Sequence, residues 1–351
     1  MKLLFFALLF FTQLSYGFTL SISNRSYGNP AFQAALDTLA DTLQTQFNSS
    51  IASASHQSDF LTAMGNANAM SARSYLSPGA MPADRNFFMN VGGSFGLALG
   101  AGSSLSSGIS FPQNQLPPIG ISAKTGVTVG ISAKKFPSFL NLDSSRLMYT
   151  ASFYTSNLSG LVGHGVTLKT AQASLGMSYQ FYPSQHWSPL VRFNGFKVSS
   201  GFSYSTFDAS FATPFNLTQG DGTYDMTWNN TVNVGVSSSI WSFTNEATAG
   251  IAVLGVMNLY AGVGLDFNVG STAVVGGSAG PVTAVQTGTS TQVFSATATI
   301  SSDSSGIGPT FAQSRFLLGT EFDVGPVGVY LQGQVANPSC YGLNFGAHFL
   351  F

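Results

Sequence analysis

Residue types that perform chemistry are few in this sequence, and they are scattered. The four histidines are His56, His164, His186 and His348. A hydrolase needs a nucleophile, a base and an orienting group held together, and no Ser-His-acid grouping stands out among the many serines. No group of His, Cys and acidic residues has the spacing of a metal site. We therefore expect no catalytic residue, no metal site and no cofactor, and we do not expect an enzyme.

The charged residues point to another kind of site. Only 7% of the residues are charged, and the formal net charge is −1, so nothing suggests a nucleic-acid partner. If the chain forms a channel, charges of both signs that face one another across its lumen could create a transverse field at the constriction. They could equally form ion pairs that hold a closed barrel together, and the sequence leaves both alternatives open. The pore-lining candidates are Lys124, Lys134, Arg192, Lys197, Asp266, Arg315, Glu321, Asp323, Tyr330 and His348.

The elements that would position these residues alternate with a period of two. In residues 119–133, apolar side chains such as Ile121, Val127 and Val129 alternate with Ser, Gly, Thr and Lys. This period is typical of a strand. A soluble sandwich would carry many charges on its outer face, but here the polar face is mostly Ser, Gly, Thr, Asn and Gln. The pattern therefore favours a barrel in lipid, with apolar side chains outward and small polar ones in the lumen.

A helical span is the weaker alternative for the long uncharged segment Ala247–Leu265, because its second half alternates. Closure is required in lipid, since an open sheet edge would leave backbone amides without partners. The fold class that we predict is all-β: a closed antiparallel transmembrane β-barrel of about twelve strands, with ten or fourteen as alternatives, after a short helical N-terminal segment. The predicted strands are 87–101, 119–133, 146–157, 167–182, 189–211, 226–240, 246–254, 258–271, about 291–300, 314–324, 327–335 and 341–351.

Two further expectations concern a change of parity within one strand and the connections between strands. The apolar parity changes at Asn194-Gly195, which could be a hairpin turn or a bulge. The bulge keeps Arg192 and Lys197 on the lumen side and is preferred. The segments 102–118, 212–225 and 272–291 are rich in Gly, Ser, Pro and Thr and are predicted to be outer loops.

The last segment, "YGLNFGAHFLF", alternates up to a terminal Phe. Together with the strand pattern of residues 87–351, it resembles Gram-negative outer-membrane β-barrel proteins. The resemblance implies a porin-like fold in the outer membrane and a final strand that pairs with the first. It also implies an assembly signal presented to the barrel-assembly machinery, carried by Tyr341, Phe345, Phe349 and Phe351.

The chain before the barrel divides into two parts. Residues 1–17 have a basic Lys2, an apolar run from Leu3 to Phe11 and small residues at Ser15 and Gly17, which predicts a secretory signal peptide. Residues 18–84 are predicted to be a helical segment, with Asn29-Pro30 as a helix start. This segment could be a lumen plug or a periplasmic extension, or it could associate with another copy. Residues 85–351 would form the barrel.

Within the N-terminal segment, "MGNANAMSARSYLSPGAM" resembles the hatch region of the FadL-type long-chain fatty-acid transporters, with Ser77-Pro78-Gly79 where that family carries Asn-Pro-Ala. The sequence as a whole predicts an outer-membrane channel for passive diffusion of small solutes. The alternatives are a plugged FadL-like transporter of hydrophobic compounds and a structural or surface-interaction barrel. The expected partners are outer-membrane lipid, the assembly machinery and small solutes, and an oligomer is compatible with the sequence.

Overall fold

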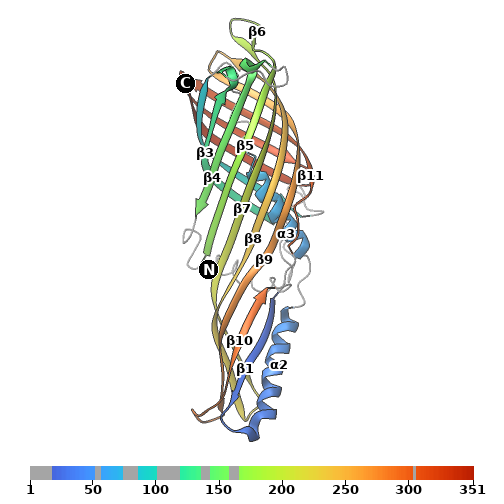
Figure 1. Cartoon of the computed structure of the whole chain (residues 1–351), viewed down its shortest axis with the longest axis vertical. Coiled ribbons are helices and arrows are strands. Elements are labelled where there is room, and N and C mark those ends of the chain that lie inside the picture. Colours follow the sequence, from blue (N-terminus) through green and yellow to red (C-terminus); the bar gives the residue numbers. More distant parts are fainter. Residues whose placement is uncertain are drawn as a thin grey trace.

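A computed structural model describes residues 18–51, 57–73, 86–100, 119–135, 143–157, 166–302 and 306–351. Ten of its strands pair side by side into a closed antiparallel ring, the barrel, which confirms the predicted fold class (Figure 1). The last strand pairs with the first barrel strand, with Phe349 opposite Met89. In ring order the strands are β2 (Phe87–Leu99), β3 (Ile119–Ser132), β4 (Leu147–Asn157), β5 (Val166–Tyr182), β7 (Val191–Gly220), β8 (Tyr224–Val253), β9 (Met257–Gln286), β11 (Ala312–Val324), β12 (Val327–Ala336) and β13 (Cys340–Leu350).

The barrel has apolar side chains outside and polar side chains inside. On β12, Val329 is 52% and Leu331 49% exposed, whereas Gln332 is 1% and Gln334 3% exposed. The same alternation holds on β11 and β13, where Leu318 and Phe345 point outward. A water-soluble barrel would have the opposite arrangement, so this surface is built for contact with lipid.

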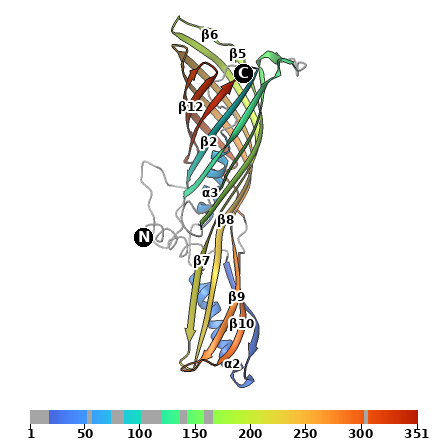
Figure 2. The same cartoon turned by 90° about the vertical axis from the view of Figure 1, so that its left-hand side faces the viewer.

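Three strands run far beyond the ring. Strands β7, β8 and β9 have 30 residues each. Where they leave the barrel, β10 (Gln292–Ser302) pairs with β9, and β1 (Phe18–Tyr27) pairs with β10. Helix α2 (Gln33–Ile51) lies along this sheet, after the short helix η1 (Pro30–Phe32) (Figure 2). We call residues 207–237 and 273–302, together with β1 and α2, the extension. The extension lies at one end of the molecule, and we call the opposite end, where the C-terminus lies, the C-terminal end.

The inner face of β8 changes its chemistry where the strand passes from barrel to extension. Even-numbered residues face inward along the whole strand. In the barrel they are polar, such as Ser242 and Thr244, and in the extension they are apolar, such as Val234 and Val236. The odd-numbered outer residues change in the opposite sense, from Trp241 to polar residues. The extension therefore has the apolar core of a water-soluble domain, on strands shared with a membrane barrel.

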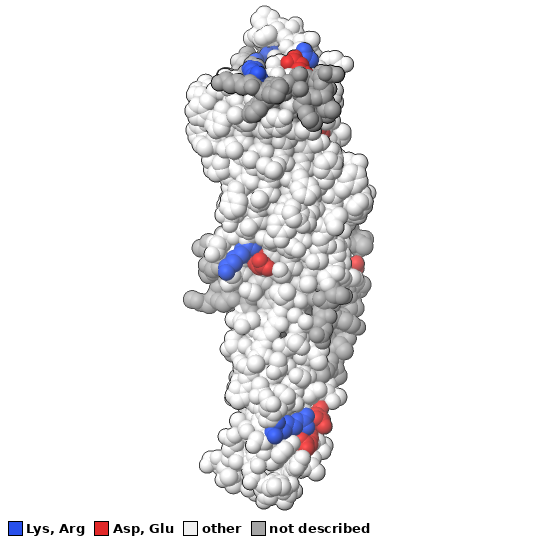
Figure 3. All heavy atoms as spheres, viewed as in Figure 1, with Lys and Arg blue, Asp and Glu red and all other residues white. Residues whose placement is uncertain are grey.

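Charged and aromatic side chains mark the limits of the lipid-facing surface. On the face seen in Figure 3, charged groups gather near the C-terminal end, at mid-height and on the extension, with uncharged surface between them. Near the C-terminal end Arg146 of η3 (Ser144–Arg146) pairs with Asp143 at 3.4 Å, and at the other limit the exposed Lys169 lies opposite Asp208. Trp241 stacks on Phe202 near this second limit, with ring centroids 5.1 Å apart. Aromatic side chains are enriched at the interfaces of membrane barrels, and this pair is consistent with that pattern.

Helix α2 is fixed to the extension through an apolar stripe and an ionic cluster. Leu36, Leu39 and Leu43 follow helical spacing and are buried against the sheet. On the other side Arg25 of β1 pairs with Asp37 at 2.8 Å and with Asp41 at 2.5 Å. The predicted helix start is confirmed, because the Asn29 side chain accepts a hydrogen bond from the Ala31 N–H.

Several strand assignments need correction. Residues 226–240 and 246–254 belong to one strand, β8, and the strand predicted near 291–300 is β10, which lies in the extension. The ring therefore has ten members among the described residues, the lower limit of the predicted range. Segments 212–225 and 272–291, predicted to be loops, contain parts of β7, β8 and β9 with only short turns between them. Residues 18–27, predicted to be part of a helical segment, form β1.

Other predictions were right or lie outside the described residues. β7 continues through Asn194-Gly195 with a shift of register and Gly195 at φ 95°, so the feature is a bulge. Segment Ala247–Leu265, the candidate helical span, lies in β8 and β9. Neither α2 nor the second described helix, α3 (Gln57–Ser71), is both long and apolar enough to cross a bilayer. The predicted signal peptide 1–17 and the loop 102–118 lie outside the described residues.

Candidate functional site

The candidate site is the barrel lumen, which contains helix α3. The helix lies against the inner faces of β2, β3 and β13 (Figure 2). At two positions its backbone approaches the wall so closely that only glycine fits. A Cβ atom on Gly96 would lie 2.3 Å from the Ala67 carbonyl oxygen, and one on Gly120 would lie 2.0 Å from that of Ala63. Close backbone approach of this kind is a characteristic use of glycine.

Small side chains on α3 complete the fit. Ala63, Ala67 and Met70 are buried and form a cluster with Cys340 and other small residues of the wall. At its beginning α3 also carries Phe60 and Leu61 into the apolar core of the extension. The helix therefore packs on both parts of the molecule, with an apolar start and a more polar end inside the ring.

Asn68 forms the first polar attachment between α3 and the wall. Lys124 of β3 donates to the Asn68 carbonyl oxygen at 3.2 Å and to its Oδ1 at 2.9 Å, and it also donates to Ser205 of β7. The Asn68 amide donates to Ser238 Oγ at 3.2 Å. One turn further, Ser71 donates to Ser122 Oγ at 2.9 Å. Buried polar groups need partners, and here the plug and the wall supply them to each other.

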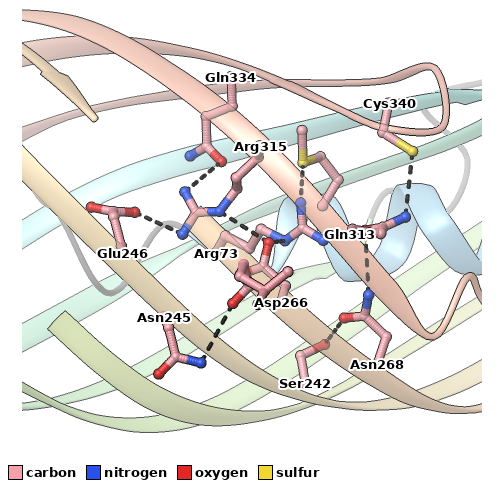
Figure 4. Close-up of polar contacts among 12 residues, drawn as sticks. Arg73, Ser242, Asn245, Glu246, Asp266, Asn268, Gln313, Arg315, Gln334 and Cys340 are labelled. Atoms are coloured by element: carbon pink, nitrogen blue, oxygen red, sulfur yellow. Dashed lines mark hydrogen bonds and ion pairs between the residues drawn. The ribbon is translucent and has the colours of Figure 1, made fainter. Parts of the chain in front are cut away.

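A cluster of buried charges forms the second attachment (Figure 4). Arg73, just after α3, lies 3.2 Å from Asp266 of β9. Arg315 of β11 lies 3.0 Å from the same carboxylate and 2.7 Å from Glu246 of β8. Arg315 also donates to Gln334 at 3.2 Å. Two guanidinium groups thus face two carboxylates, and this balance of charge is what makes their burial tolerable.

The pore-lining candidates therefore fall into three groups. Lys124 bonds to Asn68 of α3, Asp266 pairs with Arg73 just after α3, and Arg315 shares the Asp266 carboxylate. Glu321, Asp323 and His348 lie together near the C-terminal end of the lumen. The remaining candidates are spread: Tyr330 accepts from Asn90 at 3.1 Å, Arg192 donates to Asn194 at 3.3 Å, and Lys197 lies opposite Thr248 of the inner face. Lys134 is a correction, because it lies beyond β3 in η2 (Ala133–Lys135) and is exposed.

The assembly-signal residues lie on the outer face of β13 and just beyond it. Phe345 is 47% and Phe351 66% exposed, and Tyr341 and Phe349 share their parity. They are therefore available to lipid.

Sequence reasoning missed Arg73, Asn68 and Glu246. Glu246 could have been found, because it shares the parity of Thr244 and Thr248 on the polar face of one strand. Arg73 was harder to identify as a functional residue, because its only distinguishing feature is that it is a basic residue after a run of Ala, Asn and Ser. Its partner Asp266 lies nearly two hundred residues away, and no local pattern indicates that pairing.

No curated protein matches the chain. Among solved structures, the chain is similar to the translocator domain of the autotransporter NalP from Neisseria meningitidis (13% identity, TM-score 0.34, covering 82% of this chain and 100% of that chain). It is also similar to the transport unit of the autotransporter AIDA-I from Escherichia coli (8%, 0.34, 82% and 98%) and to the toluene transporter TbuX from Ralstonia pickettii (10%, 0.26, 83% and 97%).

These structures share only the architecture of an outer-membrane β-barrel with this chain. The family comparison is more specific. The sequence model of the family described as Lsa36-like matches residues 16–351, which is nearly the whole chain. The chain therefore belongs to the Lsa36-like family.

Proposed function

We propose that the protein is a membrane anchor that presents the extension at the cell surface, with a lumen closed by α3. The observation that supports this most is the fit of α3, whose backbone lies against Gly96 and Gly120 and whose polar groups bond to the wall. A helix held this closely leaves little of the lumen for solutes. The proposal includes no enzymatic step and no cofactor.

The lengths of the connections support the direction of the extension. At the C-terminal end β11 and β12 are joined by residues 325–326, and β8 and β9 by residues 254–256. The longest connection there, residues 133–146, is still much shorter than the extension at the other end. Outer-membrane barrels have short turns on the periplasmic side and longer segments outside the cell. The extension would then lie outside a Gram-negative cell. The outward-facing β13 aromatics would meet lipid and the assembly machinery at the other end.

Labelling of intact cells tests this proposal. We expect Thr223→Cys, in the exposed turn at the tip of the extension, to react with a membrane-impermeant maleimide on intact cells. Val256→Cys, in the turn at the C-terminal end, should react only after the outer membrane is permeabilised. The native Cys340 is buried and gives the background. Labelling of Val256→Cys but not Thr223→Cys on intact cells would reject the proposal.

The channel for passive diffusion of small solutes is a second candidate, favoured by the polar lumen wall. It requires α3 to move. Ser71 Oγ and Ser122 Oγ lie 2.9 Å apart, so Cys at both positions, in a Cys340→Ala background, can fix α3 by a disulfide. Conductance in planar bilayers that appears on reduction and disappears on oxidation would establish a gated channel. The single variant Ser71→Cys is the control, and equal, negligible conductance in both states supports the closed anchor.

The same pair of cysteines tests FadL-like transport. Uptake of a hydrophobic compound by the reduced protein, lost on oxidation while small-solute leakage stays constant, would support that alternative. That the protein forms an oligomer stays a prediction from the sequence. Cross-linking in membranes can test it.

A further inference from the structure

Near the C-terminal end of the lumen, three side chains converge from strands on either side of β12. Glu321 and Asp323 come from β11, and His348 comes from β13. In the sheet, Gly328 of β12 is paired with Asp323 on one side and with His348 on the other. Asp323, Gly328 and His348 therefore form one row across three strands. Side chains that are distant in the sequence lie close together in this row.

The ligand atoms of this group lie close together. His348 Nε2 is 3.2 Å from Asp323 Oδ1 and 3.4 Å from Glu321 Oε1. One potential ligand atom from each residue fits within 4.8 Å of the others. Metal–ligand bonds of about 2.0–2.2 Å place the ligands of one Zn²⁺ ion roughly 3–4 Å apart. Small side-chain adjustments would bring the three atoms onto one ion.

Gly328 creates the space for this approach. A Cβ atom at this position would lie 2.2 Å from Asp323 Oδ1 and 2.3 Å from His348 Nε2. Any other residue would separate the two groups. Because Gly328 has no side chain, the Asp323 carboxylate and the His348 imidazole can approach each other across β12.

The hydrogen bonds of the group leave donor and acceptor capacity unused. The His348 side chain is fully buried. Its Nε2 has only the contacts with the two carboxylates, and its Nδ1 makes no hydrogen bond within the part of the chain that the structure describes. Asp323 accepts from Asn258 at 2.6 Å through Oδ2, while its Oδ1, which faces His348, has no hydrogen bond there. Buried polar atoms are rarely left without a partner, so these atoms point to something that binds between them.

Charge balance favours a divalent cation. A protonated His348 would still leave one excess negative charge beside two carboxylates, and Lys197 interacts electrostatically with one of them, Glu321. A divalent ion with a neutral imidazole balances the group by itself. Imidazole with carboxylates is a donor set suited to transition metals such as Zn²⁺. The Asp323 side chain is 22% exposed, which leaves one side open for a water ligand and for entry.

We propose that Glu321, Asp323 and His348 bind one divalent transition-metal ion of the Zn²⁺ class, with solvent completing the coordination. Asn258 positions Asp323 by holding its other oxygen. The ion would connect β11 to the last strand, β13, across β12. A metal there would stabilise the C-terminal end of the ring next to its closing seam.

Cobalt binding to the full chain tests the proposal. The protein is purified in detergent, stripped with a chelator and titrated with Co²⁺, whose absorption reports ligation. We expect one Co²⁺ per chain that Zn²⁺ displaces. His348→Ala and the isosteric Asp323→Asn should weaken binding by at least the roughly tenfold that loss of an outer-shell partner alone causes. Gly328→Ala should do the same without removing any ligand.

The matched control is His186→Ala, which removes an exposed histidine from β6 (Gln185–His186), outside the group. It should bind Co²⁺ like the unmodified protein. Circular dichroism and the mobility of unheated samples in gels establish that each variant is folded, and Asp323→Asn keeps the test valid if Gly328→Ala does not fold. Unmodified protein that binds no Co²⁺, or binds it no better than His348→Ala, would overturn the proposal.

Discussion

At the scale of single residues, the charges inside the barrel act as attachments. Arg315 is fully buried between Asp266 and Glu246. Removing one member of a buried ion cluster leaves its partners without compensation, which typically costs about 3–5 kcal/mol. We expect Arg315→Gln to lower the free energy of unfolding by an amount of this order, measured by denaturant unfolding in lipid vesicles. Arg146→Gln breaks an exposed pair with Asp143 and should change stability little; equal effects of the two would contradict the role of the lumen cluster.

The ionic cluster of the extension predicts acid sensitivity. The Tyr27 hydroxyl donates to Asp37, and with the Arg25 guanidinium it lowers the pKa of that carboxyl below its ordinary value. Because the folded-state pKa is the lower one, this stabilisation is present above the unfolded-state pKa. It is lost as the pH falls through the folded-state pKa.

We therefore expect acidification to loosen α2 from β1, measured as faster hydrogen exchange in α2. Asp37→Asn should show fast exchange already at neutral pH and a smaller change on acidification. An acid response as large in Asp37→Asn as in the unmodified protein would assign it to other groups.

At the scale of elements, the fit of α3 against β2 and β3 is the decisive contact. A methyl group on Gly120 would overlap the Ala63 carbonyl. Overpacking of this kind costs about 1–3 kcal/mol, so Gly120→Ala should lower stability and make α3 more accessible to protease. Gly333→Ala is the matched control, because the nearest atom to its added Cβ would be 3.9 Å away. If protease cleaves α3 equally slowly in both variants, the close approach has no energetic role.

The elements also show what the sequence could predict. Alternation located the barrel strands, their lipid-facing sides and the closing pair of β13 and β2, because lipid selects apolar residues on every second position. It failed on β8, where apolar residues change from even positions up to Ile240 to odd positions from Trp241. The predicted strands 226–240 and 246–254 divide β8 near this change of parity. The cause is that the strand leaves the bilayer, so its inner face exchanges a polar lumen for an apolar core.

Long-range pairings were beyond the reach of the sequence for a similar reason. The site around Lys124 could be predicted only as a set of lumen-facing charges. Its partner Asn68 lies on a helix without a marked pattern, and Arg73 meets Asp266 only because β9 passes that point of the wall. Such contacts depend on the register of the strands in the ring and on how far α3 reaches into the lumen. Neither can be predicted from the local periodicity of the sequence.

At the scale of the whole molecule, barrel and extension have separate supports. The ring closes through β13 and β2 without β1 or α2. The extension depends on both, since Leu20, Ile22, Leu36 and Leu43 contribute to its core. Deletion of residues 18–51 should leave the ring folded, with unheated-gel mobility still shifted, while the extension becomes sensitive to protease. Loss of the shifted form would mean that ring formation itself needs this segment.

The positions of β1, α2 and Arg73 relative to the start of β2 have a consequence for biogenesis. β1 and α2 lie at one end, Arg73 lies inside, and Phe87 begins β2 at the other end. With the extension outside the cell, as proposed, residues 18–51 have to cross the membrane during assembly, whereas β2 begins on the periplasmic side. A tightly folded, bulky protein fused ahead of Phe18 should consequently arrest the process with the N-terminal part still inside the cell envelope, whereas an unstructured peptide tag should travel outward with it.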